Sequence, residues 1–393
     1  MTTAALVDLD LIDDIHKFGA GDVNACFSCG NCTAICPLAD NDSMFPRRVI
    51  RMAQVGLKED LVGSKELWTC YQCGLCTDRC PQEADPSEFM ATARRYAIAH
   101  YDKTRLARVI YTKPVIGVII MVVVAALFAL FFDSISKTQS QTTLALFDFI
   151  PYPTIHTAGL VLIIVVAVFS ILGIVLSFRS MARREGVTAS SLFGGGKAWG
   201  RTLRALWYAV GVEALGQKRY RADCKDDDPV EPMYRRRWLV HFLTLWGFIG
   251  LFLATVLDYL LDAIGVKATG TPVPIWYPIR LLGTLAGLSL MYGVTMLAIR
   301  RIQRARAGKE TSKFPDWLFL VMLWIIGLTG FLIEVALYAQ PVQGWGYWVF
   351  LIHVAIAMEL VLFLPFTKFA HLIYRTVALF FYGLAKTREG AAG

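Results

Sequence analysis

The sequence contains 393 residues, of which 56% are hydrophobic, and its mean hydropathy is +0.50. This composition excludes an ordinary soluble globular protein, because apolar stretches long enough to cross a bilayer occupy much of the chain. The formal net charge is +8, but the basic residues gather in loops beside the apolar stretches. Membrane topology explains that distribution, so we expect no nucleic acid partner.

The first 105 residues are charged and polar enough to form a domain in water. They begin with MTTAALVDLDLIDDIHK, an acidic stretch without the basic start and apolar centre of a signal peptide. We expect a mainly α-helical protein with a small helical domain over residues 1–105. A six-helix transmembrane bundle is expected over residues 106–393, with a cytoplasmic loop at 179–237.

Two cysteine ladders occupy the N-terminal domain. CFSCGNCTAICP begins at Cys26 and returns as CYQCGLCTDRCP at Cys70, so each cysteine has a counterpart 44 positions later. Bacterial ferredoxins use the spacing C-x2-C-x2-C-x3-C-P to hold two clusters, and the fourth cysteine of each run binds the other cluster. The ladders predict a ferredoxin-like domain with two [4Fe–4S] clusters. One ligand set is Cys26, Cys29, Cys32 and Cys80, and the other is Cys70, Cys73, Cys76 and Cys36.

Other uses of these cysteines fit the spacing less well. A zinc ribbon uses two separated pairs and has no use for a third cysteine at the same short spacing. A covalent c-type haem needs a histidine where Gly30 or Gly74 stands, and those glycines instead allow a tight turn beside the sulfurs. Disulfides need an oxidising compartment, and the cytoplasmic location predicted below for this domain does not provide one. The ninth cysteine, Cys224, is predicted to be an ordinary thiol, with a place beside a partner's cofactor as the alternative.

Six apolar runs follow the ladders, and crossing a bilayer takes about 20 residues. The runs cover residues 114–132, 155–178, 238–261, 280–299, 316–338 and 347–374. Thirteen Lys or Arg lie in 179–237 and six in 300–313, whereas the alternate loops hold only Lys137, Lys267 and Arg280. Basic loops stay in the cytoplasm. We therefore predict a multi-pass protein of the cytoplasmic membrane with both termini and the cysteine ladders on the cytoplasmic side.

Four histidines fall inside these runs, where ionisable residues are costly and usually functional. They are His156, His241, His353 and His371. The last two are 18 residues apart, so on a straight helix five turns place them on one face, about 27 Å apart. Matching depths then pair His156 with His353 and His241 with His371. Each pair can hold one haem b between helices, with an exchanged pairing or a single haem as alternatives.

The loop at 179–237 contains LFGGGKAWG, which is predicted to be a hinge, followed by an amphipathic helical pattern. Its apolar positions are Trp199, Leu203, Leu206, Trp207 and Val210, with Arg201 and Arg204 between them. Such a helix suits the plane of the membrane interface. It suits a docking surface for a partner equally well, and periodicity does not separate the two.

The sequence shows no dinucleotide fingerprint and no constellation for hydrolysis or group transfer. Clusters and haems carry single electrons, so a quinol is the natural two-electron partner within a membrane. Glu334 and Lys267 are the first candidates for handling its protons, followed by Asp258 and Glu359. For each, the alternative is a residue that reaches towards water or pairs with a neighbour.

The residues also resemble known families. FPRRVIRMAQVGL and LWTCYQCGLCTDRCP resemble the iron–sulfur subunit of heterodisulfide reductases. RRRWLVHFLTLWGFIGLF and the spacing of the last two histidines resemble the cytochrome b gamma subunit of respiratory nitrate reductase. The fusion, over almost the whole chain, is similar to the membrane subunit of the quinone-interacting membrane-bound oxidoreductase (Qmo) complex. In one departure, Leu251 stands ten positions after His241, where the gamma subunit has a second histidine. The ligand that is missing at position 251 must come from elsewhere, and His156 is the membrane histidine that is left for it.

The resemblance implies that menaquinone is the substrate in the membrane. It implies as partners two cytoplasmic flavin and iron–sulfur subunits related to the flavin-containing subunit of heterodisulfide reductase, and through them adenylylsulfate reductase. We therefore predict an electron-transfer subunit that joins menaquinol, two haems b and two [4Fe–4S] clusters. The alternatives are the membrane subunit of a heterodisulfide reductase-like or sulfite-linked respiratory complex, and a redox sensor or anchor.

Overall fold

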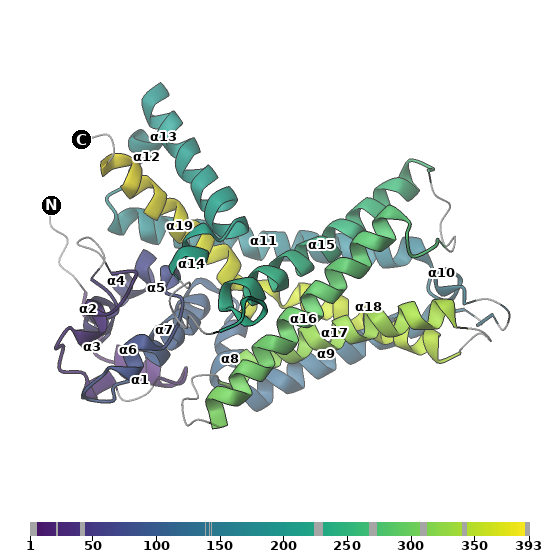
Figure 1. The fold of residues 1–393 in the computed structure, drawn as a ribbon, viewed down its shortest axis with the longest axis horizontal. Coiled ribbons are helices and arrows are strands. Elements are labelled where there is room, and N and C mark those ends of the chain that lie inside the picture. Colours follow the sequence, from purple (N-terminus) through teal and green to yellow (C-terminus); the bar gives the residue numbers. More distant parts are fainter. Residues whose placement is uncertain are drawn as a thin grey trace. The chain divides into compact units, whose positions relative to one another are not determined.

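The structure is a computed structural model, shown as a ribbon in Figure 1. It describes residues 6–20, 23–39, 44–137, 139–140, 142, 144–223, 231–266, 273–306, 313–339 and 344–389. Every regular element among these residues is a helix, which confirms the mainly α-helical fold predicted from the sequence.

The chain divides into two compact units. The cysteine unit comprises Met1–Gly117, Val168–Asp223 and Leu364–Gly393. The long-helix unit comprises Val118–Ala167 and Cys224–Phe363. Two helices, α9 (Pro114–Ser134) and α11 (Tyr152–Arg184), contribute residues to both units. The domain boundary predicted after residue 105 stays a prediction.

The cysteine unit consists of short helices and one longer buried helix, α7 (Pro86–Tyr101). The helices before α7 are α1 (Leu11–His16), η1 (Val23–Ala25), α2 (Asn31–Ala34), α3 (Arg47–Gln54), α4 (Lys58–Val62), α5 (Lys65–Thr69) and α6 (Leu75–Asp78). The later ones are α8 (Leu106–Thr112), α12 (Ala189–Phe193), α13 (Gly196–Trp207), η2 (Tyr208–Leu215), α14 (Lys218–Asp223), η4 (Leu364–Phe366) and α19 (Ala370–Glu389). Both cysteine ladders therefore lie among helices of only one or two turns.

Polar contacts fix α7 to its neighbours. The Asp85 carboxylate accepts a hydrogen bond from the Glu88 amide at 3.2 Å and one from the Thr77 hydroxyl at 2.6 Å, so the helix is capped and tied to the second ladder. Within α7, Arg95 pairs with Glu88 at 3.0 Å and also donates to the Phe18 carbonyl at 3.1 Å. Removing one partner of such a buried pair costs about 3–5 kcal/mol, because the other charge is left uncompensated.

Six helices are long and apolar enough to cross a membrane, as the sequence predicts. They are α9 and α11, whose bounds are given above, α15 (Arg237–Ala263), α16 (Pro278–Arg306), α17 (Phe314–Tyr338) and α18 (Trp345–Leu362). In α16 the membrane-length part is Pro278–Gln303. The multi-pass character of the chain is thereby supported by structure as well as composition.

The sixth predicted span, 347–374, is wrong in its second half. Helix α18 ends at Leu362, a short turn (η4) follows, and α19 begins only at Ala370. The physical reason is Pro365, which lacks an N–H and whose ring clashes with the carbonyl four residues earlier. His353 and His371 therefore do not share the face of one continuous helix, and His371 lies outside the six membrane-length helices.

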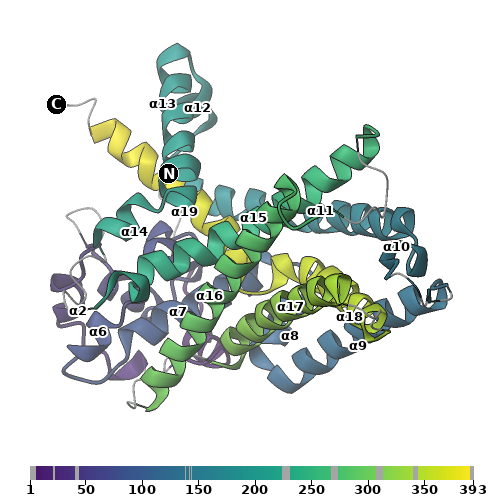
Figure 2. The ribbon, with the colours of Figure 1, turned by 45° about the vertical axis from the view of Figure 1, so that its right-hand side comes forward.

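Close helix packing holds the long-helix unit together. Helices α15 and α16 lie side by side, as do α17 and α18 (Figures 1 and 2). At Gly247 the α15 backbone comes so near α16 that an added Cβ would lie 2.5 Å from the Leu290 nitrogen. Small residues allow this approach between membrane helices, so a larger residue at Gly247 would push the two apart.

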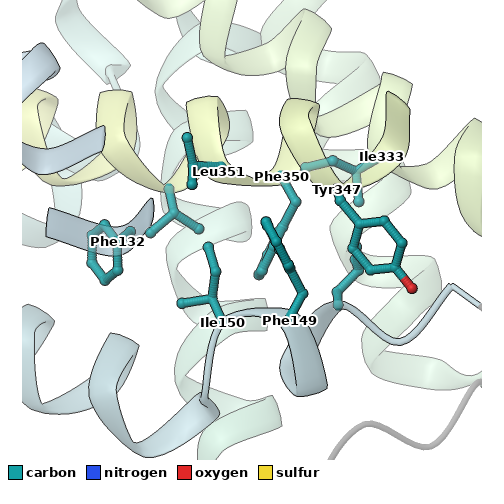
Figure 3. Close-up of a cluster of buried hydrophobic side chains, with 9 residues drawn as sticks. Phe132, Phe149, Ile150, Ile333, Tyr347, Phe350 and Leu351 are labelled. Atoms are coloured by element: carbon teal, nitrogen blue, oxygen red, sulfur yellow. The ribbon is translucent and has the colours of Figure 1, made fainter. Parts of the chain in front are cut away.

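A second contact region in this unit is an apolar cluster near the short helix α10 (Leu146–Phe149). Figure 3 shows Phe149 and Ile150 pointing towards residues of α18, among them Tyr347 and Phe350. Phe132 of α9 and Ile333 of α17 belong to the same cluster. It packs parts of four helices together at one end of α18.

Candidate functional site

The two cysteine ladders adopt the same local conformation. Gly30 and Gly74 have φ of +90° and +96°, a left-handed region that a side chain disfavours. Each precedes a single helical turn, α2 or α6, after which the fourth cysteine follows. Ser28 and Gln72, also 44 positions apart, share positive φ values of 64° and 53°. The repeat in sequence is thus a repeat in structure.

Four thiols from both ladders line one hollow in the cysteine unit. Cys36 comes from the first ladder, and Cys70, Cys73 and Cys76 come from the second. The other lining residues are Pro37, Leu38, Phe45, Pro46, Tyr71, Gln72, Leu75 and Ser87. Four cysteine sulfurs within a largely apolar wall are the donors that a [4Fe–4S] cluster requires. The residues present therefore fit this group.

The remaining ladder cysteines interact around Cys32. Burial raises the pKa of the Cys32 thiol, and the neighbouring thiols of Cys26, Cys29 and Cys80 raise it further. Close by, the Asn31 side chain donates a hydrogen bond of 2.5 Å to the Arg79 carbonyl, which ties the first ladder to the second. The fourth cysteine of the second ladder is in this way kept near the first three of the other.

Two of the thiols around the hollow, those of Cys36 and Cys76, have a raised pKa. Burial raises the pKa of Cys36 to about 11, with Cys70 and Cys73 adding to the effect. Burial likewise raises the pKa of Cys76 well above its ordinary value. Thiols bind metal as thiolates, so a cluster would displace these protons. Within the described ranges, no three His, Cys, Asp or Glu residues are grouped to hold a single metal ion.

His353 on α18 is oriented by the neighbouring helix α17. The Thr329 hydroxyl lies 2.9 Å from His353 Nδ1, and a Cβ added at Gly330 would lie 3.4 Å from Cε1 of the ring. A hydrogen bond to Nδ1 fixes the ring and leaves Nε2 for a metal, as is usual for metal-binding histidines. The residue therefore fits an axial haem ligand.

His156 and His241 also lie in the long-helix unit. The His156 ring packs beside two tyrosines, with centroid distances of 4.0 Å to Tyr152 and 4.6 Å to Tyr259. His241 is exposed on α15. The pairing of His156 with His353 stays a prediction, as does that of His241 with His371.

His371 lies in the cysteine unit, nine positions beyond the end of α18 at Leu362. Its ring centroid is 6.2 Å from that of Trp68. Trp68 belongs to α5 and is two residues before Cys70. A predicted haem ligand is therefore adjacent to a predicted cluster-binding ladder within one compact unit.

The predicted quinone-site residues have separate surroundings. Glu334 on α17 accepts hydrogen bonds from Arg280 at 3.3 Å and from the Thr284 hydroxyl at 3.0 Å. It therefore pairs with a neighbour, which is the alternative to a role in proton transfer that the sequence left open. Glu359 is buried on α18, with 5% of its surface exposed. Lys267 and Cys224 lie outside the described residues.

Two functional candidates were missed from the sequence. Thr329 contacts His353 across two helices, and no spacing in the sequence connects residues 24 positions apart in this way. Arg375 on α19 donates to the carbonyls next to Cys70. It follows His371 by four positions, so the helical neighbour rule could have identified it.

Two known protein families match most of the chain. The 4Fe-4S dicluster domain family matches residues 22–84, and the citrate utilization protein B family matches residues 103–392. Citrate utilization protein B of Escherichia coli is 30% identical over 179 residues, or 43% of each chain. No solved structure matches the chain.

Heterodisulfide reductase subunits match the cysteine region. One, from the H2:CoB–CoM heterodisulfide, ferredoxin reductase of Methanothermobacter thermautotrophicus, is 34% identical over 62 residues, covering 16% of this chain and 34% of the relative. The iron–sulfur subunit of the CoB–CoM heterodisulfide reductase of Methanopyrus kandleri is 41% identical over 46 residues, covering 12% and 24%. The chain spans less than half the length of each curated relative it matches.

These similarities confirm the resemblance of the ladders to the iron–sulfur subunit of heterodisulfide reductases. The resemblance of the membrane helices to the nitrate reductase gamma subunit stays a prediction. An iron–sulfur domain of this kind supports a role in electron transfer, within an oxidoreductase of several subunits. With residues 103–392 matched, the chain belongs to the citrate utilization protein B family.

Proposed function

We propose that this chain is the membrane electron-transfer subunit of a quinone-linked oxidoreductase. The observation that carries the proposal is the position of His371. It lies just beyond the last of six membrane-length helices, and its ring packs 6.2 Å from Trp68, beside the second cysteine ladder. One polypeptide thus has a predicted haem ligand, which follows its last membrane-length helix in the sequence, next to its second cysteine ladder.

The two ladders hold two [4Fe–4S] clusters in this proposal. The set Cys36, Cys70, Cys73 and Cys76 is supported by the hollow that these four residues line. The set Cys26, Cys29, Cys32 and Cys80 is supported by the mutual effect of these thiols on the pKa of Cys32. Such clusters supply one-electron transfer. The chain contributes the thiolates and the left-handed glycine turns that present them.

Four histidines hold two haems b, with His156 and His353 as one pair and His241 and His371 as the other. Support is most direct for His353, whose Nδ1 is fixed by Thr329 at 2.9 Å. Because the break at Pro365 removes the shared helix face, the second pair rests on the sequence prediction alone. Bound haem supplies reversible one-electron chemistry within the membrane.

Menaquinol is the proposed membrane substrate. Glu334 and Lys267 are the proposed residues for its protons, and the hydrogen bonds from Arg280 and Thr284 hold the Glu334 carboxylate in one orientation. The basic loops favour a cytoplasmic location for both termini and for the cysteine unit. Electrons then travel between the lipid phase and the cytoplasm.

The soluble partner is proposed to be a cytoplasmic flavoprotein. Family membership favours one that serves citrate utilization, since that is the process in the family's name. The resemblance of the sequence to the quinone-interacting membrane-bound oxidoreductase favours flavin and iron–sulfur subunits related to heterodisulfide reductase, coupled to adenylylsulfate reductase. These two kinds of partner can be distinguished by experiment. The tagged chain is purified from native membranes, and the proteins that remain bound to it are identified.

A cofactor census tests the proposal as a whole. The purified full-length chain is assayed by pyridine haemochrome and by low-temperature EPR after reduction. We expect two haems b and two [4Fe–4S] clusters per chain. Zinc in place of iron, or absence of haem from a preparation with intact clusters, would overturn the proposed route.

A further inference from the structure

A half-buried arginine on α19 contacts the residues beside the second ladder. Arg375 lies one helical turn after His371, so both residues leave the same side of the helix. Its Nη1 donates to the Trp68 carbonyl at 2.6 Å and to the Thr69 carbonyl at 3.3 Å. Trp68 and Thr69 are the last two residues of α5, directly before Cys70.

The same guanidinium also lies against the residue that follows Cys70. It is 5.4 Å from the centroid of the Tyr71 ring, within the range of a cation–π contact. From the other side, the Tyr71 hydroxyl donates to Asp223 at 3.0 Å and its ring packs 4.8 Å from Tyr220. Cys70 is therefore held between two residues that Arg375 contacts directly.

The carbonyl groups at the end of a helix can be hydrogen-bonded by a donor that carries no charge. Water or a neutral amide could donate to the two carbonyls at the end of α5. Arginine keeps its positive charge at all ordinary pH values. A fixed positive charge beside a cluster ligand favours the form of the cluster with one more electron, because the potential depends on local charge and hydrogen bonding.

We propose that Arg375 raises the reduction potential of the cluster held by Cys70, Cys73, Cys76 and Cys36. This inference rests on the proposed function. Arg375 is a positioning residue, since it contacts the ladder and not a substrate.

Potentiometric EPR titration of the full-length protein in membranes tests this role. Arg375→Gln removes the charge but keeps a donor, and we expect a lower cluster potential with the cluster retained. Arg375→Lys is expected to stay near the wild-type potential. Lys386→Gln, a matched charge removal on the exposed side of the same helix, should leave it unchanged.

An unchanged potential in Arg375→Gln overturns the proposal. Loss of the cluster in that variant also overturns it, in favour of a purely structural role. A wild-type protein that carries no clusters or no haem would instead overturn the proposed function. Failure of the Arg375 proposal and failure of the proposed function are therefore distinguishable.

A different observation carries a second proposal, which concerns α13 and the π-helical turn η2 that continues it. In an ordinary amphipathic helix the large apolar residues are buried, whereas here they are exposed. Apart from Glu213 near the end of η2, the buried positions are small, namely Ala198, Thr202, Ala205 and Ala209. Ala205 packs towards α19, where its Cα would lie 3.4 Å from a Cβ added at Gly383.

The large apolar residues face outwards. They are Trp199, Leu203, Leu206, Trp207 and Val210, with exposed fractions of 48%, 45%, 48%, 70% and 38%. At about 100° per residue they form one stripe, and Lys197, Arg201 and Arg204 form another on the opposite side of the buried face. Trp199 also packs 5.7 Å from the exposed Phe193 of α12.

We infer that this stripe lies in the interface of a bilayer rich in anionic lipid. Tryptophan and leucine suit the boundary of the acyl chains, and Lys197, Arg201 and Arg204 supply cations on the same helix for anionic head groups. The same chain has six helices of membrane length, which favours a lipid occupant for the stripe. This inference selects between the two roles that the sequence leaves open for this segment.

Photo-crosslinking in native membranes identifies what covers the stripe. The full-length protein carries p-benzoylphenylalanine at Leu203, or at Arg204 as the control on the basic face. We expect lipid adducts from position 203 by mass spectrometry, several-fold more than from position 204. Adducts mainly with another protein or a second copy, or equal lipid labelling at both positions, would contradict the inference.

Discussion

The cysteine ladders and the histidines differ in how their positions are fixed. Each ladder places three of its cysteines within seven consecutive residues, around turns whose glycines have positive φ. The histidines lie on four different helices, α11, α15, α18 and α19, and only tertiary packing orients them. A metal site set by local turns is insensitive to helix register, whereas a site between helices depends on every contact that holds those helices.

This difference also separates the chemistry of the two regions. Burial, with a smaller contribution from neighbouring thiols, raises the pKa of Cys36 and Cys76, so the ionisation of these two thiols is coupled to metal binding. His353 is instead contacted by residues of a neighbouring helix, among them Thr329 through its hydroxyl. Loss of a ligand should therefore remove a whole cluster or haem, whereas changes in the turns or in the helix packing around a ligand should act in graded steps.

Replacing Cys73 by Ser has the largest expected effect. It removes one of four thiolate ligands from the hollow, so the EPR signal of that cluster should disappear and the iron content should fall. Cys224→Ser, the cysteine outside the ladders, is the control and should retain both clusters. Two intact cluster signals in Cys73→Ser would contradict the ligand assignment.

His353 tests the region set by helix packing. His353→Ala should remove one haem in a pyridine haemochrome assay and leave the cluster signals intact. Thr329→Val, which deletes the hydrogen bond to Nδ1 but keeps the shape, should retain the haem and shift its potential. Equal haem content in wild type and His353→Ala would show that this histidine is not a ligand.

Glu334 tests the proposed quinone site. Glu334→Gln keeps the contacts with Arg280 and Thr284 possible but cannot take a proton, so menaquinol oxidation should slow by about 10²-fold. Haem content should not change, which distinguishes a proton-transfer role from a structural one. If the rate is unaffected, the ion pair with Arg280 is the whole function of this residue.

Gly74→Ala has a smaller effect on the cysteine unit. At φ of +96°, an added Cβ should destabilise the turn by about 1–2 kcal/mol. The expected observation is bleaching of cluster absorbance at lower urea concentration. Gln72→Gly, in the same loop at φ of +53°, relieves strain and should move the midpoint in the opposite direction. Identical midpoints would mean that the local turn does not limit cluster stability.

The sequence was most informative where function depends on local spacing. The 44-residue repeat predicted two equivalent turns, and Gly30 and Gly74 adopt the expected conformation. Hydropathy predicted six membrane-length helices, because a span is defined by composition alone. The break at Pro365 could have been predicted too, since proline ends helices, but the apolar run on both sides concealed it.

Contacts between distant segments could not be predicted. Arg375 meets Trp68 across 307 positions, and Thr329 meets His353 across two helices. No periodicity in one segment specifies its neighbour in space. For the same reason the roles of α13 needed the structure, which shows that its small residues are buried and its large ones exposed.

Stopped-flow mixing of native membranes with a menaquinol analogue tests the central claim most directly. If electrons enter this chain from the quinone pool, the b-haem absorbance should change rapidly in wild type and lose one component in His353→Ala. A haem spectrum that stays oxidised in wild type, in membranes where both clusters are present, would contradict the account and favour a redox sensor or anchor.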